Sequence, residues 1–315
     1  MRILFTGGSS FTGHWFIKEL AAAGHQVIAT FRRQLEEYVD EPRRQRVGAL
    51  AKVCRSVFGV SFGDQGFLRL IKEGHFDVLC HHGADVTNYK SPTFDVASAV
   101  ANTTYQLPLV LDTLKNSGCS KIVVTGSVFE NDEGVGSGSI RAFSPYGLSK
   151  AFTWQTFRYY TQVRQLTLGK FVIPNPFGPY EEPRFTSYLM KNWFAGKVAV
   201  VNTPLYVRDN IHVSLLAKSY SRYARSLVDG ITRINPSGYI ESQGAFTQRI
   251  ASEMQSRLSL KCEFELKPQT DFPEPYARIN TDLCDPKSLD WDEATAWDGL
   301  ADYYSRLMGS PKSDS

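Results

Sequence analysis

The stretch MRILFTGGSSFTGHWF, residues 1–16, decides the fold. An apolar segment at 2–6 leads into a loop of glycine, serine and threonine, and then into a helix predicted over about 12–23 that ends at Gly24. In a strand–turn–helix unit the N–H groups that begin the helix face an anion, and glycines let it approach closely. Such a turn can also be purely structural. At the first junction of an alternating chain, however, it predicts a dinucleotide site.

Strand-like and helix-like segments alternate through the first half of the chain. Further strands are expected at 26–30, near 57–62, and at 76–84, 120–127 and 169–174; helices are expected at 65–73, 99–118 (with Pro108 as a local disturbance) and 146–165. This alternation predicts an α/β fold, a Rossmann-type doubly wound parallel sheet with right-handed crossovers.

The pattern changes after about residue 175, where strands become short and proline, glycine and aromatic residues become frequent. We therefore expect two domains. Residues 1–175 would form an NAD(P)-binding Rossmann domain that carries the catalytic residues. Residues 176–315 would form mostly a smaller C-terminal substrate lobe, with some segments returning to the sheet.

Composition excludes several classes of protein. A net charge of +3 over 315 residues gives no argument for binding nucleic acid or a membrane. The five cysteines are scattered and lack CxxC spacing, as expected of reduced thiols in a cytoplasmic protein. No apolar run approaches the roughly 20 residues of a membrane span. His81 and His82 are adjacent without a ligand cluster, so no metal is expected.

The end of the second strand bears on the cofactor. An acid there would bind the adenosine ribose of NAD. Here the sequence is IATFRR, with Thr30 and Phe31 in place of the acid, followed by Arg32 and Arg33. Guanidinium groups suit a 2′-phosphate. The alternative is a solvated loop. We expect NADP(H) to be preferred, with NAD(H) possible.

A candidate catalytic set lies in VVTGS and SPYGLSK. Tyr146 and Lys150 are four residues apart and share one face of a helix. The ammonium group would favour tyrosinate, so that the phenol can exchange a proton with a substrate oxygen during hydride transfer. Ser127 ends the preceding strand and could hold the same oxygen.

Together, TGGSSFTG, Ser127, Tyr146 and Lys150 resemble the extended short-chain dehydrogenase/reductases of the nucleotide-sugar epimerase/dehydratase/reductase type. FGD, FDVLCHHGADV (family DVVFHLAA), IPNPFGPYE (family RxxNVYGP) and VRDNIHVSLLA (family RDFIHVDDLA) extend the resemblance. The resemblance implies cofactor contacts by Gly7, Ser9, Ser10, Phe11, Thr12, Gly13, Arg32, Arg33, Asp64, Gly83, Ala84, Asn102, Tyr146, Lys150 and Pro174. It implies substrate contacts by Asp85, Val86, Ser127, Asn175, Arg208 and Arg278, with His212 as a structural neighbour.

Two departures from the family pattern carry information. The family turn is TGGxGFxG, so Ser10 replaces its middle glycine; either the loop shifts or the hydroxyl joins the phosphate contacts. The 4,6-dehydratases carry acids directly after the catalytic Ser or Thr, whereas here Val128 and Phe129 precede Glu130. SVFENDEG is therefore interpreted as a loop with solvated carboxylates, or else as a substrate contact.

The resemblance implies NADP(H)-dependent chemistry on a nucleotide-activated sugar, first of all a 4-keto reductase of an NDP-deoxy-4-ketosugar. The alternatives are an NDP-sugar 4-epimerase, a reductase of a non-sugar aldehyde or ketone, and a non-catalytic NADP-sensing regulator. A homodimer through helices near 94–115 and 146–165 is also expected by resemblance.

Overall fold

The structure is a computed structural model that describes residues 1–138 and 141–309. The described chain forms two compact units. Unit 1 contains residues 1–133, 141–173 and 217–236, and unit 2 contains residues 134–138, 174–216 and 237–309.

Unit 1 is built on a seven-stranded sheet in which every paired strand is parallel, in the order β11-β7-β5-β4-β1-β2-β3. Its strands are β1 (Arg2–Thr6), β2 (Gln26–Phe31), β3 (Arg55–Phe58), β4 (Val78–His81), β5 (Lys121–Ser127), β7 (Thr167–Ile173) and β11 (Ile231–Ile234). The strand order reverses beside β1, whose neighbours are β2 and β4. In doubly wound sheets ligands bind at the carboxyl ends of the strands, at such a reversal. The predicted Rossmann-type fold is confirmed.

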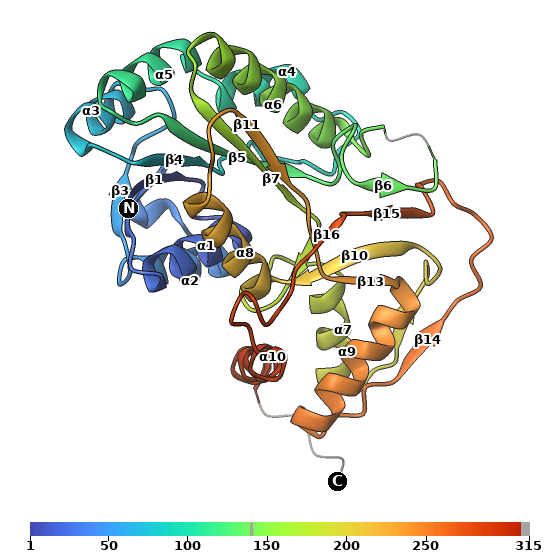
Figure 1. Cartoon of the computed structure of the whole chain (residues 1–315). Coiled ribbons are helices and arrows are strands. Elements are labelled where there is room, and N and C mark those ends of the chain that lie inside the picture. Colours follow the sequence, from blue (N-terminus) through green and yellow to red (C-terminus); the bar gives the residue numbers. More distant parts are fainter. Residues whose placement is uncertain (139–140, 310–315) are drawn as a thin grey trace. The chain divides into compact units, whose positions relative to one another are not determined.

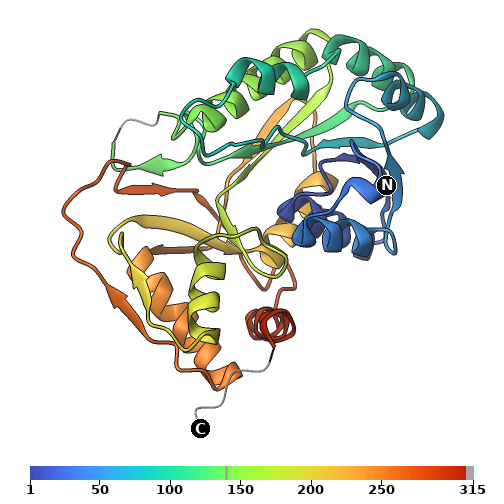
Figure 2. The same cartoon turned by 180° about the vertical axis from the view of Figure 1, so that it is seen from behind.

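Helices cover both faces of this sheet (Figures 1 and 2). One face carries α3 (Gln65–Gly74), α4 (Val96–Thr103), α5 (Leu107–Asn116) and α6 (Pro145–Val163), and the other carries α1 (Phe11–Ala22), α2 (Glu41–Leu50) and α8 (Val213–Arg225). A short 3-10 helix spans Leu35–Glu37. The core under α3, α5 and α6 is formed by strand residues such as Leu4, Leu79 and Ile122, all fully buried. Burying such side chains stabilises the fold by roughly 1.5–3 kcal/mol each.

Two elements differ from the predictions. The third strand is Arg55–Phe58 rather than a segment near 57–62. The helix expected over 99–118 is two helices, because the chain turns between Thr103 and Leu107, where Gln106 has a φ of 50°. Pro108 lies in the first turn of the second helix. Since proline has no N–H to donate, it is tolerated in the first turn of a helix but not in its interior.

Unit 2 contains a sheet in the order β13-β10-β15-β6, with β8 also paired to β10. These strands are β6 (Val135–Gly136), β8 (Asn175–Phe177), β10 (Val207–His212), β13 (Tyr239–Ser242) and β15 (Ala277–Ile279). Two further pairs join β9 (Ala199–Val201) to β14 (Phe264–Leu266) and β12 (Pro236–Ser237) to β16 (Asp282–Leu283). Residues of α7 (Phe185–Phe194), α9 (Gln243–Leu258) and α10 (Glu293–Met308) share one apolar core.

Candidate functional site

The glycine-rich loop between β1 and α1 is held against the end of β4. Gly7 has a φ of +81°, and a Cβ placed on it would lie 2.7 Å from the Gly83 nitrogen and 2.8 Å from the His82 carbonyl carbon. A Cβ on Gly13 would lie 2.8 Å from Ser10 Oγ and would collide with the Gly7 carbonyl oxygen. Both positions therefore need glycine. The resulting close-packed backbone at a helix N-terminus fits a pyrophosphate group.

Ser10 is part of the loop's own hydrogen bonding. It is the N-cap of α1, where its Oγ accepts from the Gly13 N–H at 3.1 Å and donates to the Gly7 carbonyl oxygen at 2.9 Å. Its oxygen also lies 3.0 Å from His82 Nε2. The hydroxyl thus makes structural hydrogen bonds that a glycine at this position could not make. The sequence predicts either a shift of the loop or a contact between the Ser10 hydroxyl and phosphate. Both stay predictions.

His82 joins this loop to the strand that ends in Ser127. Its Nε2 lies 3.1 Å from Thr12 Oγ1, and its Nδ1 lies 2.9 Å from Thr125 Oγ1 on β5. Because the Ser10 hydroxyl donates to a carbonyl, its oxygen is free to accept from a His82 Nε2–H. Burial, together with the charge of Lys150, lowers the pKa of His82 to about 3. His82 is therefore a neutral bridge.

A His82→Leu variant is expected to reduce the acid sensitivity of the fold. Below about pH 6.5 the unfolded chain binds a proton at His82, whereas the folded chain binds one only near pH 3. The free energy of unfolding therefore falls as the pH is lowered from 6.5. Relative to the variant, wild type should lose about 1.4 kcal/mol per pH unit more between pH 6 and 5. Urea unfolding at several pH values measures this slope.

The control for this experiment is Phe76→Leu, a buried change without a titrating group. It should shift stability equally at every pH. Equal slopes for wild type and His82→Leu would show that the His82 ring is already protonated in the folded protein.

Arg46, on α2, lies near the glycine-rich loop, and it was not predicted from the sequence as a site residue. Its side chain is fully buried, and its Nε donates to the Ser9 carbonyl oxygen at 2.9 Å. Its own carbonyl accepts from His14 Nδ1 at 3.1 Å. A guanidinium group buried beside this loop adds positive charge, which favours an anionic ligand there. Its partner is 37 residues away in the chain, so no local pattern marks it.

At the end of β2, Thr30 and Phe31 are buried, while Arg32 and Arg33 are exposed. The charge of Arg32 reaches Asp85, which follows β4. Burial raises the pKa of Asp85, but hydrogen bonds from Thr87 and Asn102, with Arg32, bring it below its ordinary value. Both arginines are therefore free to approach an anion from solvent, and their contact with a 2′-phosphate stays a prediction.

The other expected cofactor residues of unit 1 lie near the carboxyl ends of its strands. The Asp64 carboxylate accepts from the N–H groups of Ser61 and Phe67, both at 2.7 Å, and so caps α3. The Gly83 N–H donates to Thr6 Oγ1 at 3.0 Å, and Ala84 follows it. Asn102 Nδ2 donates to Asp85 at 3.1 Å. Asp64 thus has a structural role, and its contact with adenine stays a prediction.

The candidate catalytic residues belong to β5 and the first turns of α6. Ser144 caps this helix and accepts from the Gly147 N–H at 3.3 Å. Gly147 packs against the backbone of Phe129, two residues after Ser127, so closely that a Cβ would lie 2.9 Å from the Phe129 carbonyl carbon. The start of α6, with Tyr146, is thereby held against the loop that follows Ser127.

Lys150 is buried one helical turn after Tyr146. Burial lowers its pKa to about 8; the charge of Glu130 acts in the opposite sense and that of Lys170 in the same sense. A lysine poised near neutral pH is typical of sites where proton transfer is needed.

Two aromatic side chains that were not predicted from the sequence as site residues lie beside Tyr146. Its ring is edge-on to Tyr89, with ring centroids 5.4 Å apart, and to Phe94 at 6.2 Å. Both come from the segment between β4 and α4, which also contains Val86, a residue that is 46% exposed. They form an apolar wall beside the phenol, and no local motif distinguishes them from core aromatics.

The expectation of solvated carboxylates in SVFENDEG is wrong for two of them. Glu130 is fully buried and Glu133 is 3% exposed. Lys170 Nζ on β7 donates to Glu130 at 2.6 Å and to Glu133 at 2.5 Å. Burying a carboxylate requires such a partner, and this one lies about 40 residues further along the chain.

The expected ligand residues of unit 2 are clustered on β8, β10 and β15. Pro174 is buried before β8, and Asn175 is paired in register with Asn210. Asn175 Nδ2 is buried without a hydrogen-bond partner among the described residues. Arg208 lies opposite Arg278, which is 1% exposed. Arg208 donates to Glu274 at 2.8 Å and covers the Tyr206 ring at 4.4 Å.

Further residues of unit 2 are structural. Asp209 is buried and accepts from the N–H groups of Gly238 and Asn280, at 2.8 Å and 3.1 Å. His212 is buried, with Nδ1 2.7 Å from Ser214 Oγ, and burial lowers its pKa to about 3. It is thus a neutral packed side chain.

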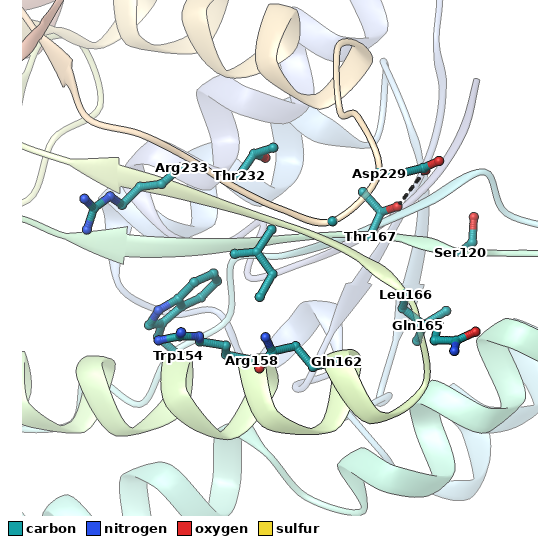
Figure 3. A pocket seen from close by; sticks show the side chains of 12 residues that line it. Ser120, Trp154, Arg158, Gln162, Gln165, Leu166, Thr167, Asp229, Thr232 and Arg233 are labelled. Carbon is teal, nitrogen blue, oxygen red and sulfur yellow. Dashed lines mark hydrogen bonds between the residues drawn. The ribbon is translucent and has the colours of Figure 1, made fainter.

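A groove of about 1050 Å³ lies between α6 and the edge strand β11 of unit 1. Figure 3 shows Trp154, Arg158 and Gln162 on the helix below the strands. Ser120, Thr167 and Asp229 line it where β5, β7 and β11 begin, whereas Ser127 is the last residue of β5 and Tyr146 and Lys150 lie in the first turns of α6. None of the expected site residues lines this groove, so its size does not make it the active site.

No group of three or more His, Cys, Asp or Glu within residues 1–138 and 141–309 is arranged to hold a metal ion. In the same part of the chain, no helix has both the length and the apolar character needed to cross a bilayer.

Solved structures share this fold along nearly the whole chain. UDP-glucose 4-epimerase from Thermotoga maritima, solved with UDP-glucose, is 17% identical with a TM-score of 0.72, covering 98% of this chain and 100% of its own. UDP-glucuronic acid 4-epimerase from Bacillus cereus, solved with UDP-glucuronic acid and NAD, is 15% identical with a TM-score of 0.71, and the match covers 98% of this chain and 100% of that one. UDP-glucose 4-epimerase from Stenotrophomonas maltophila, solved with NAD and formylated UDP-arabinopyranose, is 19% identical with a TM-score of 0.72, and the match covers 98% of this chain and 98% of that one.

No curated protein matches the sequence. The model of the NAD dependent epimerase/dehydratase family matches residues 3–235, which contain the glycine-rich loop, Ser127, Tyr146 and Lys150. This match covers most of the chain and agrees with the sheet order and the loop geometry. The chain belongs to the NAD dependent epimerase/dehydratase family of extended short-chain dehydrogenase/reductase enzymes.

Proposed function

We propose that the protein is an NADP(H)-dependent 4-keto reductase of an NDP-deoxy-4-ketosugar. The observation that carries this proposal is the end of β2, where buried Phe31 replaces the ribose-binding acid and exposed Arg32 and Arg33 follow. A 2′-phosphate is the group that such a pair recognises. A freely exchanging NADPH suits a net reduction, whereas an epimerase reuses its cofactor.

The residues of unit 1 divide the chemistry among them. The loop from Gly7 to Gly13 would hold the pyrophosphate, and the bound nicotinamide would supply the hydride. Tyr146 would donate the proton to the sugar oxygen, and Ser127 would hold that oxygen by its hydroxyl. Lys150, as an ammonium group, would lower the pKa of Tyr146 and bind the nicotinamide ribose.

The position of the acids supports a reductase over a dehydratase. Elimination of water needs an acid or base that can reach the substrate. Both carboxylates of the segment that are buried, Glu130 and Glu133, are already bound to Lys170. They hold an internal cation rather than face a ligand.

Unit 2 offers groups for the nucleotide diphosphate. Asn175 Nδ2 is a buried donor without a partner among the described residues, which supports its proposed contact with a ligand. Arg208 and Arg278, side by side on paired strands, would supply positive charge. The UDP-sugars in the solved structures support a nucleotide sugar over a simple ketone.

A second candidate is an NDP-sugar 4-epimerase with bound NAD. The solved structures above are 4-epimerases, and two of them hold NAD. The catalytic residues would then serve oxidation and reduction in turn.

The exposed face of α6 supports the expected homodimer. It carries three large apolar side chains, Phe152, Tyr159 and Val163, which are 49%, 63% and 64% exposed. Exposed apolar side chains that gather on one face are typical of a protein–protein contact.

The test is to denature the purified protein, identify the released nucleotides by mass spectrometry, and then measure NADPH oxidation with NDP-4-keto-6-deoxyhexoses. An empty site and NADPH oxidation that depends on the ketosugar support the reductase. Retained NAD together with interconversion of UDP-hexoses identifies the epimerase. Binding of NADPH without turnover of either class supports the NADP-sensing regulator.

Arg32→Ala is expected to weaken NADPH binding by about 10–10²-fold and NADH binding little, because a charge-assisted bond to phosphate contributes about 1.5–3 kcal/mol. Fluorescence titration of the emptied protein measures both. The control is Arg44→Ala, an exposed arginine on α2, which should change neither. Equal weakening of NADPH and NADH by Arg32→Ala would remove this arginine from cofactor selection.

A further inference from the structure

Directly behind Ser127 lies a buried cluster of charged side chains. Glu130 Oε1 accepts from the Ser127 N–H at 2.7 Å, and its Oε2 accepts from Lys170 Nζ at 2.6 Å. Lys170 also donates to Glu133, whose other oxygen accepts from Asn235 Nδ2 at 3.0 Å. Arg233 lies 3.6 Å from the same Glu133 oxygen.

This cluster is a poor way to stabilise a fold. Glu130, Glu133 and Lys170 are each at most 3% exposed, and removing such charges from water offsets most of the gain from pairing them. Gly126 on β5 leaves room for the cluster, because a Cβ there would lie 2.6 Å from Lys170 Cε and 2.9 Å from Glu130 Oε1. Its location beside the catalytic candidates therefore needs a functional reason.

Glu130 also acts on Lys150 through space. The charged and titratable groups that act on Lys150, or on which its charge acts, are Glu130 after β5, Lys170 on β7, His81 at the end of β4 and His82 directly after it. Both histidines are held neutral by burial, which lowers their pKa to about 3. Among these groups Glu130 is the one that supplies negative charge to Lys150.

The hydrogen bonds indicate the charge state of Glu130. Burial raises its pKa, and the charges of Lys170 and Lys150 act in the opposite sense. Both of its oxygens accept hydrogen bonds, one from an N–H and one from an ammonium group. Only the ionised carboxylate accepts at both oxygens without needing to donate.

We propose that Glu130 is a positioning residue for the proposed reaction. It fixes the backbone of Ser127 by accepting its N–H, and it keeps Lys150 protonated by placing a carboxylate behind it. Lys170 holds this carboxylate in place, under the ring of Trp154 at 5.0 Å. Glu133 anchors Lys170, and within residues 1–138 and 141–309 its bonds go to Lys170, Asn235 and Arg233 rather than to the catalytic residues. The proposal rests on the proposed function for its effect on turnover, but its effect on Lys150 is independent of substrate.

The variants Glu130→Gln and Glu133→Gln test this division of roles. Each removes one carboxylate charge from Lys170 without changing the shape of the side chain, and in Glu130→Gln the new amide oxygen can still accept from the Ser127 N–H. The pKa of Lys150 is measured in the cofactor-free protein by an NMR titration of its side-chain signal, assigned with Lys150→Arg. Circular dichroism and urea unfolding show that each variant is folded.

We expect Glu130→Gln to lower the pKa of Lys150 by about one unit, because the variant removes the buried carboxylate whose negative charge favours the ammonium form of Lys150. Glu133→Gln should lower it by less than half as much. In turnover assays Glu130→Gln should shift the alkaline limb of the kcat profile to lower pH by about one unit and leave KM for the sugar nucleotide within about twofold.

An unchanged pKa of Lys150 in folded Glu130→Gln, or equal shifts in the two variants, overturns the proposal. If Glu130→Gln is unfolded in buffer, it is refolded with an osmolyte such as trimethylamine N-oxide, which favours the compact state. Wild type and Glu133→Gln are then titrated in the same solvent, and an unchanged pKa of Lys150 in Glu130→Gln overturns the proposal equally. Absence of any turnover by wild type would refute the proposed function alone, because the titration does not depend on it.

Discussion

Tyr146→Phe is expected to reduce turnover by about 10²–10⁴-fold, the range that a general acid or base contributes. The substitution removes only the phenolic oxygen, so the ring remains against Tyr89 and Phe94. The proton for the sugar oxygen would then have to come from water. Because the loss occurs in the chemical step, kcat should fall while KM and cofactor affinity change little. Steady-state kinetics and a cofactor titration measure these quantities.

The matched control is Tyr159→Phe on the same helix, which removes an equivalent hydroxyl from a side chain that is 63% exposed. It should leave turnover unchanged. Full activity in Tyr146→Phe would exclude Tyr146 as the proton donor and would leave Ser127 and Lys150 as the candidates for that role. Since Lys150 has a pKa of about 8, it is the group that could replace the phenol.

The local sequence was sufficient to predict the parts of the fold that depend on neighbours in the chain. The periodicity predicts the parallel sheet, and the glycine-rich turn predicts the loop, because Gly7 and Gly13 are needed for contacts made within a few residues or at the adjacent strand. The four-residue spacing of Tyr146 and Lys150 predicts that they share a helix face, as they do. Their catalytic roles stay predictions.

The features that the sequence did not reveal depend on distant partners. Glu130 looks like a surface carboxylate until the fold brings Lys170 to it from β7. Arg46 belongs to a charged segment whose composition indicates solvent, yet its guanidinium group is buried against Ser9. The same limit explains the helix break before Pro108, which requires Gln106 to adopt a positive φ. Charge burial and backbone breaks are tertiary properties, so local patterns do not report them.

Gly7→Ala is expected to lower dinucleotide affinity by about 10²-fold or more and to destabilise unit 1. Gly24→Ala should destabilise unit 1 less and leave dinucleotide affinity nearly unchanged. Both glycines have a φ near +80°, so both variants incur the cost of the left-handed region, roughly 1–2 kcal/mol. They differ in their surroundings, because nothing lies within 4 Å of a Cβ on Gly24, while a Cβ on Gly7 meets the backbone of His82 and Gly83.

This difference separates strain from ligand binding. The peptide of Gly83 cannot move away from a Gly7 methyl group without breaking its bond to Thr6 Oγ1 and displacing the loop that Ser10 closes. Such overpacking costs about 1–3 kcal/mol beyond the strain, and it falls on the loop proposed to hold the pyrophosphate. Nucleotide titration and urea unfolding of both variants measure the two effects. If Gly24→Ala weakens binding as much as Gly7→Ala does, general loss of stability explains the defect; if only Gly7→Ala weakens it, the dinucleotide binds where β1 meets α1.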